Sequence, residues 1–223
     1  MTFEDYPDFE MLAMDVANKI VGELNDALLT GGTATLAVPG GTTPGPVFDE
    51  LSAADLDWSQ VRVVLTDERW VPESSARSNT RLVRERLLTG RAAAATMVPL
   101  YLPAETPEEV LERLTIRVKA ALPLTVLILG MGSDMHTASL FPGADRLDEA
   151  LGDDAPPVLP MRAPGAGEPR VTLTAPVLTG AMSTHLIITG AEKRAALDKA
   201  RRLDPAEAPV ALILGGATVH WAP

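Results

Sequence analysis

The chain has 223 residues, 46% of them hydrophobic and 22% charged, with no cysteine and a formal net charge of −11. The acidic balance argues against nucleic acid as a partner, because such binding depends largely on Lys and Arg neutralising phosphates, and the lack of cysteine excludes disulfides and favours a cytoplasmic location. The size fits one domain over residues 1–223, no apolar run is long enough for a membrane span, and the acidic first residues do not resemble a signal peptide.

Apolar runs of strand length alternate along the chain with stretches of helical periodicity. The strand-like runs are almost continuously apolar, which is typical of strands covered on both faces. Their alternation with helices predicts an α/β fold with a mostly parallel sheet and helices on both faces. The predicted strands cover residues 33–38, 61–66, 97–100, 124–129, 184–189 and 210–214, and the predicted helices cover residues 8–29, 44–53, 78–88, 107–120 and 191–202. Residues 153–167, rich in Pro and Gly, are interpreted as an ordered loop.

The first predicted strand runs into a glycine turn, Gly40-Gly41-Thr42-Thr43, just before Pro44, where a helix is predicted to begin. Glycines allow a tight turn that exposes backbone N–H groups, and a helix N-terminus adds partial positive charge, so the arrangement suits a phosphate. Thr42 or Thr43 can cap the helix. The same pattern also occurs as a plain connection between a strand and a helix.

Basic residues follow two other predicted strands. Arg69 comes just after Asp67 and Glu68, and its guanidinium can bind a phosphate through two hydrogen bonds. The two acids can hold that arginine or bind sugar hydroxyls, and the alternative is a surface ion pair of little energetic weight. Lys193 lies in the first turn of a predicted helix, where a cation opposes the helix dipole. A neighbouring anion would explain this placement, although Glu192 partly offsets it.

The most informative segment is LTVLILGMGSDMHTASLFPG, residues 124–143. An apolar strand ends there at Gly130 and Gly132, and Asp134 and His136 follow. Open α/β sheets present catalytic groups at the carboxyl ends of their strands, so this turn is a candidate active site. A plain turn with polar residues is the alternative.

The three histidines, at positions 136, 185 and 220, are far apart and lack the spacing of metal ligands. We therefore expect no metal site. His185 lies inside a predicted strand and is expected to be structural, while His220 has no assigned role.

Together these segments resemble the 6-phosphogluconolactonases. The resemblance rests on Gly-Gly-Thr-Thr-Pro at 40–44, Asp-Glu-Arg at 67–69, Ser-Asn at 78–79, the signature at 128–143, Arg-Val-Thr-Leu-Thr at 170–174 and Thr-Gly-x-x-Lys at 189–193. It implies the fold shared by sugar-phosphate isomerases and CoA transferases. It also implies an enzyme without a cofactor that acts on a small phosphorylated sugar lactone.

The resemblance further implies roles for individual residues in the hydrolysis of 6-phospho-D-glucono-1,5-lactone, a step of the oxidative pentose phosphate pathway. His136 would be the general base, and Asp134 would orient its imidazole or bind sugar hydroxyls. If His136 lies at the start of a short helix, the helix dipole would disfavour the imidazolium. Backbone N–H groups of the turn Gly130–Gly132 would stabilise the oxyanion. Substrate hydroxyls and phosphate would be held by Gly40, Gly41, Thr42, Thr43, Asp67, Arg69, Arg170 and Lys193.

Three departures from the family pattern accompany the resemblance. Met135 stands where the family usually has glycine, and it would be strained if that position requires a positive φ. Pro39 replaces a small hydroxyl residue and removes one N–H donor, and Thr42 replaces the usual serine. The oligomeric state is not predicted.

Two rival functions remain at the level of sequence. The first is an isomerase of the glucosamine-6-phosphate deaminase type, with Asp67 as the proton-transfer base. In that family the segment between the signature histidine and the following proline contains Asn-Glu. At this point the present chain has Ser139-Leu140-Phe141 and lacks the carboxylate. The second is a non-catalytic sugar-phosphate sensor, which would require a DNA-binding module that this acidic chain lacks.

Overall fold

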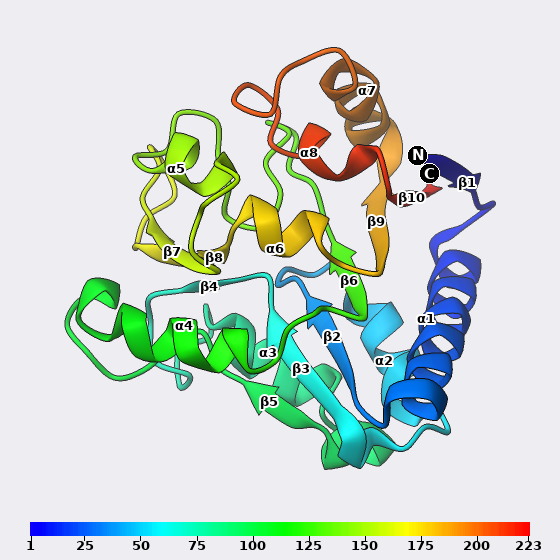
Figure 1. Ribbon diagram of the computed structural model, residues 1–223. Coiled ribbons are helices and arrows are strands. Elements are labelled where there is room, and N and C mark those ends of the chain that lie inside the picture. Colours follow the sequence, from blue (N-terminus) through cyan, green and yellow to red (C-terminus); the bar gives the residue numbers. More distant parts are fainter.

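A wholly parallel seven-stranded sheet forms the centre of the protein (Figure 1). The computed structural model describes residues 1–223. The strands lie in the order β1-β10-β9-β6-β2-β3-β5, so the chain leaves the centre of the sheet in one direction after β2 and in the other after β6. Their bounds are β1 Thr2–Asp5, β2 Ala34–Val38, β3 Val61–Leu65, β5 Thr96–Val98, β6 Val126–Leu129, β9 Ser183–Thr189 and β10 Thr218–Ala222. The prediction of an α/β fold with a mostly parallel sheet is confirmed.

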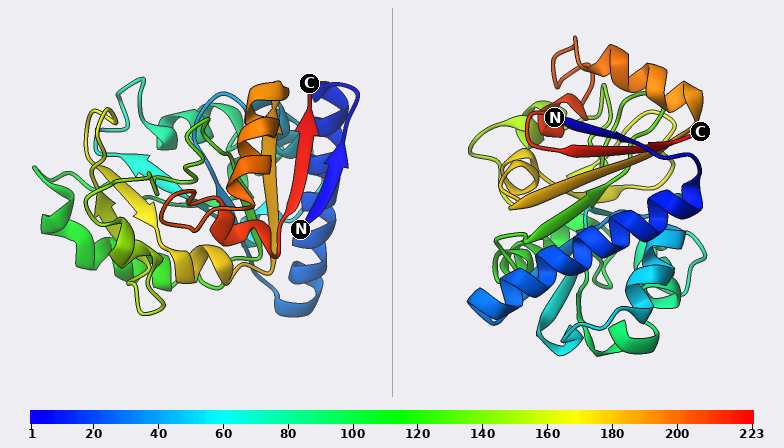
Figure 2. Two further views of the ribbon diagram at one scale, coloured as in Figure 1. Left: turned by 90° about the horizontal axis from the view of Figure 1, so that it is seen from above. Right: turned by 90° about the vertical axis from the view of Figure 1, so that its right-hand side faces the viewer.

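Helices surround this sheet (Figures 1 and 2). The longest, α1, begins where the side chain of Asp8 accepts a hydrogen bond of 2.8 Å from the N–H of Met11, and it ends just before Gly32, whose φ is 73°. Its apolar face packs against α2 and against β2, β6, β9 and β10. No helix of the structure is both long and apolar enough to cross a bilayer. The helices are α1 Phe9–Gly31, α2 Gly45–Ala53, α3 Asn79–Arg86, α4 Leu111–Lys119, α5 Leu147–Leu151, α6 Ala175–Thr179, α7 Gly190–Ala200 and α8 Ala211–Leu214, with short 3₁₀ turns at Trp58–Gln60, Gly90–Ala94 and Pro107–Val110.

A second, antiparallel sheet was not predicted from the sequence. It consists of β4 (Asp67–Arg69), β8 (Arg170–Leu173) and β7 (Val158–Met161), in the order β4-β8-β7. The interpretation of residues 153–167 as a loop is therefore wrong in part, because it contains β7. A four-residue strand that includes a proline carries little local signal, and its pairing with β8 supplies the missing stabilisation.

One predicted strand is a helix in the structure. Residues 210–214 lie in and just before α8, whereas the last strand of the sheet, β10, comes later at Thr218–Ala222. Both β10 and the edge strand β1 were missed. They pair with each other in parallel, so the first and last strands of the chain lie side by side with the two termini at opposite ends of the pair (Figure 2).

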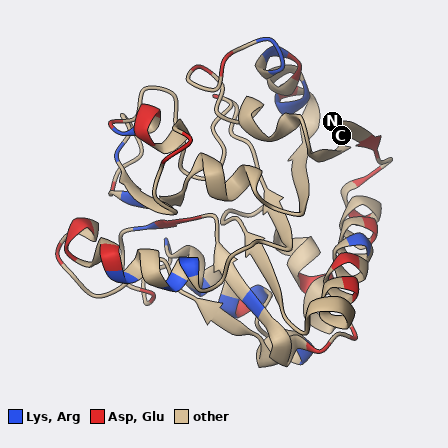
Figure 3. Ribbon diagram, in the orientation of Figure 1, with Lys and Arg blue, Asp and Glu red and all other residues tan.

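Acidic side chains are spread over α1 and the peripheral helices, as Figure 3 shows. The interior is a single cluster of 58 buried apolar residues. Most of the negative charge of the chain is thus carried on the surface, and the buried acidic residues are Asp67 and Glu68.

Candidate functional site

The loops that follow β2, β3, β6 and β9 meet at the carboxyl edge of the parallel sheet. They surround a cavity of about 240 Å³ close to the boundary between β2 and β6, where the direction of strand addition reverses. Open α/β sheets place their ligands at such a point. The cavity is lined by most of the residues that the sequence singles out, namely Gly40, Gly41, Thr43, Asp67, Arg69, Gly130, Gly132, His136, Arg170 and Lys193.

His136 and Asp134 form a directly hydrogen-bonded pair at this cavity. The imidazole Nδ1 lies 2.5 Å from Oδ1 of Asp134, and the same oxygen accepts a hydrogen bond of 3.2 Å from the N–H of His136. The Phe141 ring packs on the imidazole with 4.3 Å between centroids. A carboxylate that accepts the Nδ1 proton holds the imidazole in the tautomer whose Nε2 is a free base. Asp134 itself does not line the cavity, so its contact with the imidazole favours an orienting role.

The loop around His136 contains two non-glycine residues with positive φ, Met135 at 67° and Ala138 at 49°. Met135 thus stands in the positive-φ region, the case in which a methionine at this position is strained. The side chain of Met135 is buried, its N–H donates to the carbonyl of Gly132 at 2.9 Å, and its carbonyl accepts from the N–H of Val210 at 3.1 Å. Packing and hydrogen bonds therefore hold a backbone conformation that costs about 1–3 kcal/mol.

Two details of this loop bear on the roles implied by the sequence. No helix begins at His136, because the loop folds back in a turn closed by a bridge between Thr137 and Leu140. No helix dipole therefore acts on the imidazole. In addition, the N–H of Gly132 donates to the carbonyl of His136 at 3.0 Å, so this one N–H of the turn Gly130–Gly132 is not available as an oxyanion donor. Glycine is needed at 132 for another reason: a Cβ there would overlap the imidazole and the Asp134 carboxylate.

Two arginines lie next to each other on adjacent strands of the small antiparallel sheet. Arg69 on β4 and Arg170 on β8 are direct partners in the strand register, and both line the cavity. Like charges in opposing positions destabilise a sheet, and the Nε of each guanidinium is buried without a hydrogen-bond partner. Burial lowers the pKa of Arg170; Asp67 opposes this effect and the charge of Arg69 adds to it. An anion bound between the two guanidiniums would offset this repulsion.

Arg69 is held in place by neighbouring polar groups. Its Nη1 donates to the carbonyl of Arg77 at 2.7 Å and to Oδ1 of Asn79 at 3.1 Å. Asn79 in turn donates from Nδ2 to the carbonyl of Asp67 at 2.9 Å. Glycine is required at position 40, because a Cβ there would overlap the Asn79 side chain. Asn79 was not predicted as a site residue, although Ser-Asn at 78–79 belongs to the resemblance.

One interpretation of the sequence was that Glu68 holds the guanidinium of Arg69. In the structure the Glu68 carboxylate does not contact that guanidinium. Its fully buried carboxylate accepts from the N–H groups of Arg69, Asn79 and Thr80 at 2.7–2.8 Å and from the Ser78 hydroxyl at 3.1 Å. These donors belong mostly to the first turn of α3, so Glu68 fixes that helix against β4. Its role is structural.

The glycine turn after β2 differs in detail from the prediction. Thr42 is exposed and does not line the cavity, whereas Gly41 and Thr43 do. Neither threonine caps α2, whose N-cap residue is Pro44 without a side-chain hydrogen bond. The helix N-terminus is thus left without a side-chain cap beside the cavity.

Lys193 and Arg194 have separate roles in the first turns of α7. Lys193 lines the cavity and makes no ion pair with any acidic residue of the structure. Arg194 pairs with Asp5 at 2.7 Å and stacks over the Trp221 ring at 4.4 Å, away from the site. The cationic residues that line the cavity, Arg69, Arg170 and Lys193, thus come from three separate parts of the chain.

His185 and His220 lie outside the cavity, buried between the sheet and α1. Nδ1 of His185 is 2.9 Å from Nε2 of His220, and Nε2 of His185 is 2.9 Å from Glu23. The structural role expected for His185 fits this placement. No three His, Asp or Glu side chains of the structure form a group that could hold a metal ion.

Comparison with known proteins gives one consistent result. Residues 7–221 match the family model described as glucosamine-6-phosphate isomerases/6-phosphogluconolactonase. The chain is 45% identical over 219 residues to the 6-phosphogluconolactonase of Rhizobium meliloti, covering 95% of this chain and 94% of that protein. It is 43% identical to the one of Pseudomonas aeruginosa over 215 residues, covering 95% of this chain and 90% of that protein. The crystal structure of a 6-phosphogluconolactonase from Shewanella baltica superposes with a TM-score of 0.96 at 31% identity, covering 100% of this chain and 98% of that one. This chain belongs to the family of glucosamine-6-phosphate isomerases and 6-phosphogluconolactonases.

Proposed function

We propose that this protein hydrolyses 6-phospho-D-glucono-1,5-lactone to 6-phospho-D-gluconate. Relatives at up to 45% identity over most of the chain carry the name 6-phosphogluconolactonase. The observation that carries the proposal is the arrangement of one cavity, where an imidazole paired with a carboxylate lies together with two opposed arginines. A substrate for such a site has a phosphate at one end and a carbon open to attack by water at the other.

In this proposal His136 is the general base. With Nδ1 hydrogen-bonded to Asp134, Nε2 takes a proton from water as the water attacks the lactone carbonyl carbon. The ring C–O bond of the tetrahedral intermediate then breaks, and the alkoxide leaving group takes the proton held on Nε2 of His136, which gives the free acid and restores the neutral base. Asp134 keeps the imidazole oriented and stabilises the imidazolium that forms.

The phosphate would be bound by the cationic groups of the cavity. Arg69 and Arg170 offer their guanidiniums, Lys193 offers an ammonium without an ion-pair partner, and the turn at Gly40-Gly41 adds backbone N–H groups. Fixing this dianion orients the lactone ring toward His136, which lowers the entropic part of the barrier. Asp67 accepts hydrogen bonds from substrate hydroxyls in this scheme.

The function is tested by following hydrolysis of freshly prepared lactone above its spontaneous rate. His136→Ala should lower kcat by ~10²–10⁴-fold with KM little changed, because general-base catalysis contributes about that much. Arg69→Ala should mainly raise KM. An unchanged kcat in His136→Ala would remove this residue from the role of base.

The same assay distinguishes the rival isomerase. Ammonia release from glucosamine 6-phosphate without lactone hydrolysis would replace the proposed activity by that of a deaminase. Binding of the phosphorylated sugar with neither reaction would indicate a sensor.

A further inference from the structure

We propose that Ser139 is a positioning residue that sets the carboxylate of Asp67 for recognition of a substrate hydroxyl. The proposal rests on the proposed lactonase function and deepens its description of the site. Ser139 does not line the cavity and its side chain is fully buried. It acts on the substrate through Asp67, which does line the cavity.

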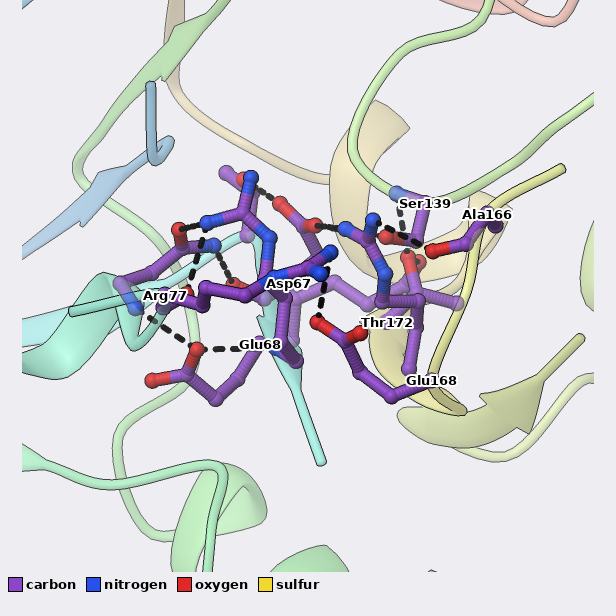
Figure 4. Close-up of polar contacts among 12 residues, drawn as sticks. Asp67, Glu68, Arg77, Ser139, Ala166, Glu168 and Thr172 are labelled. Carbon is purple, nitrogen blue, oxygen red and sulfur yellow. Dashed lines mark hydrogen bonds and ion pairs between the residues drawn. The ribbon is translucent and has the colours of Figure 1, made fainter. Parts of the chain in front are cut away.

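The hydroxyl of Ser139 donates to Oδ2 of Asp67 at 2.6 Å, a short distance typical of a hydroxyl bound to a charged acceptor. The N–H of Ser139 donates to Oγ1 of Thr172 at 3.2 Å. Asp67 and Thr172 are direct partners in the register of β4 and β8. Ser139 is therefore bound to both strands at one point of the small sheet, as Figure 4 shows.

The other contacts of Asp67 are longer than its hydrogen bond from Ser139. Oδ1 accepts from the Thr66 hydroxyl at 3.1 Å, while Nη1 of Arg170 lies 3.8 Å from Oδ2, beyond hydrogen-bond distance. The bond from Ser139 is thus the shortest that restrains rotation of the carboxylate. A carboxylate accepts about four hydrogen bonds, so positions remain for donors that enter the cavity.

The backbone conformation at Ala138 directs the side chain of Ser139 toward Asp67. Ala138 has a φ of 49° and lines the cavity, whereas the next residue, Ser139, turns into the protein. His136 lies three residues earlier on the same loop. One serine thereby connects the loop that carries the imidazole to the strand that carries the carboxylate.

The proposal is tested by a double-mutant cycle on lactone hydrolysis with Ser139→Ala and Asp67→Ala. Ser139→Ala should raise KM by ~10-fold, the size expected for loss of a hydrogen bond to a charged group, and should change kcat by less than ~3-fold. In the Asp67→Ala background the same substitution should change KM by less than ~2-fold, because its target is gone. Ser139→Cys, similar in size with a weaker donor, should give an intermediate KM and keeps the test open if Ser139→Ala folds poorly.

Thr174→Val is a matched control. Thr174 is fully buried directly after β8, and its hydroxyl donates to the carbonyl of Pro156 at 2.7 Å without contacting the site. Its KM and kcat should equal those of the wild type, while urea unfolding reports the loss of a buried hydrogen bond.

Each outcome decides the proposal. Equal KM effects of Ser139→Ala with and without Asp67 would show a structural role and overturn it, as would a loss confined to kcat. Wild-type protein without lactonase activity would overturn both this proposal and the proposed function, whereas an active wild type with a normal Ser139→Ala variant would overturn this one alone.

Discussion

Mild acid should destabilise this protein through His220, a residue far from the cavity. His220 lies on β10 with no exposed surface. Its Nε2 is 2.9 Å from Nδ1 of His185, and its Nδ1 is 3.0 Å from the Tyr6 hydroxyl. Burial lowers the pKa of His220 from 6.5 to about 4, and the charge of His185 contributes in the same direction, although nearby Glu4 opposes it.

The sign follows from proton binding in the two states. Between pH 6.5 and about 4 the unfolded chain protonates this imidazole and the native chain does not, so stability is fully present above pH 6.5 and is lost as the pH falls to about 4. The difference between 6.5 and about 4, at about 1.36 kcal/mol for each unit of pKa, gives a total of about 3 kcal/mol. A loss of about 1 kcal/mol is expected between pH 6.5 and 5.5.

Urea unfolding at pH 7.5, 6.5 and 5.5 on the wild type and on His220→Asn measures this effect. The variant should be less stable at pH 7.5, because a buried network is broken, and it should lose markedly less stability than the wild type on acidification. The carboxylates around this network, Glu4, Asp15 and Glu23, all have pKa values lowered from their ordinary range, so their contributions are lost only at more acidic pH. Parallel losses in the two proteins between pH 7.5 and 5.5 would refute the reasoning.

Three other predictions concern the cavity and its loops. Gly132→Ala should reduce kcat by about 10²-fold with an intact fold, because the new Cβ displaces the His136 imidazole; normal turnover in the purified variant would contradict the tight approach of the imidazole. Ala138→Gly should raise the free energy of unfolding by about 0.5–1 kcal/mol, since glycine adopts the φ of 49° without strain; chemical denaturation measures it, and a loss of stability would argue against strain at this residue. Lys193→Ala should raise KM with unchanged unfolding behaviour, whereas Arg194→Ala should lower stability and leave KM unchanged, because only Lys193 lines the cavity; the reverse pattern would exclude Lys193 from substrate binding.

The site could be predicted from the sequence because its residues lie at the ends of strands. Gly40, Asp67, Gly130 and Lys193 each follow an apolar run, and parallel strands bring such positions to one edge of a sheet. Asn79 escaped prediction because its importance depends on a contact with Arg69 that only the folded chain creates.

The small antiparallel sheet was equally inaccessible to sequence analysis. β4 has three residues and β7 includes a proline, so neither carries a strand pattern. The opposition of Arg69 and Arg170, on which the phosphate assignment depends, arises from the pairing of segments about a hundred residues apart. The sequence of either segment alone does not indicate which residues of the two strands will be paired.

The tetrapeptide Leu-Ile-Leu-Gly, which occurs twice, shows what the local sequence determines and what tertiary structure decides. At 127–130 it forms the end of β6, and at 212–215 it forms α8 and the residue that follows it. The apolar composition by itself determined that both copies are largely buried. Strand or helix was decided by the surroundings: β6 lies between β2 and β9, whose backbone groups satisfy its own, whereas the second copy has no neighbouring strand and forms hydrogen bonds within its own turn. The sequence alone thus determined what is buried and where the strands that lead into the site end. Only tertiary structure decided the conformation of such short apolar segments, because backbone groups removed from water adopt whichever structure provides them with partners.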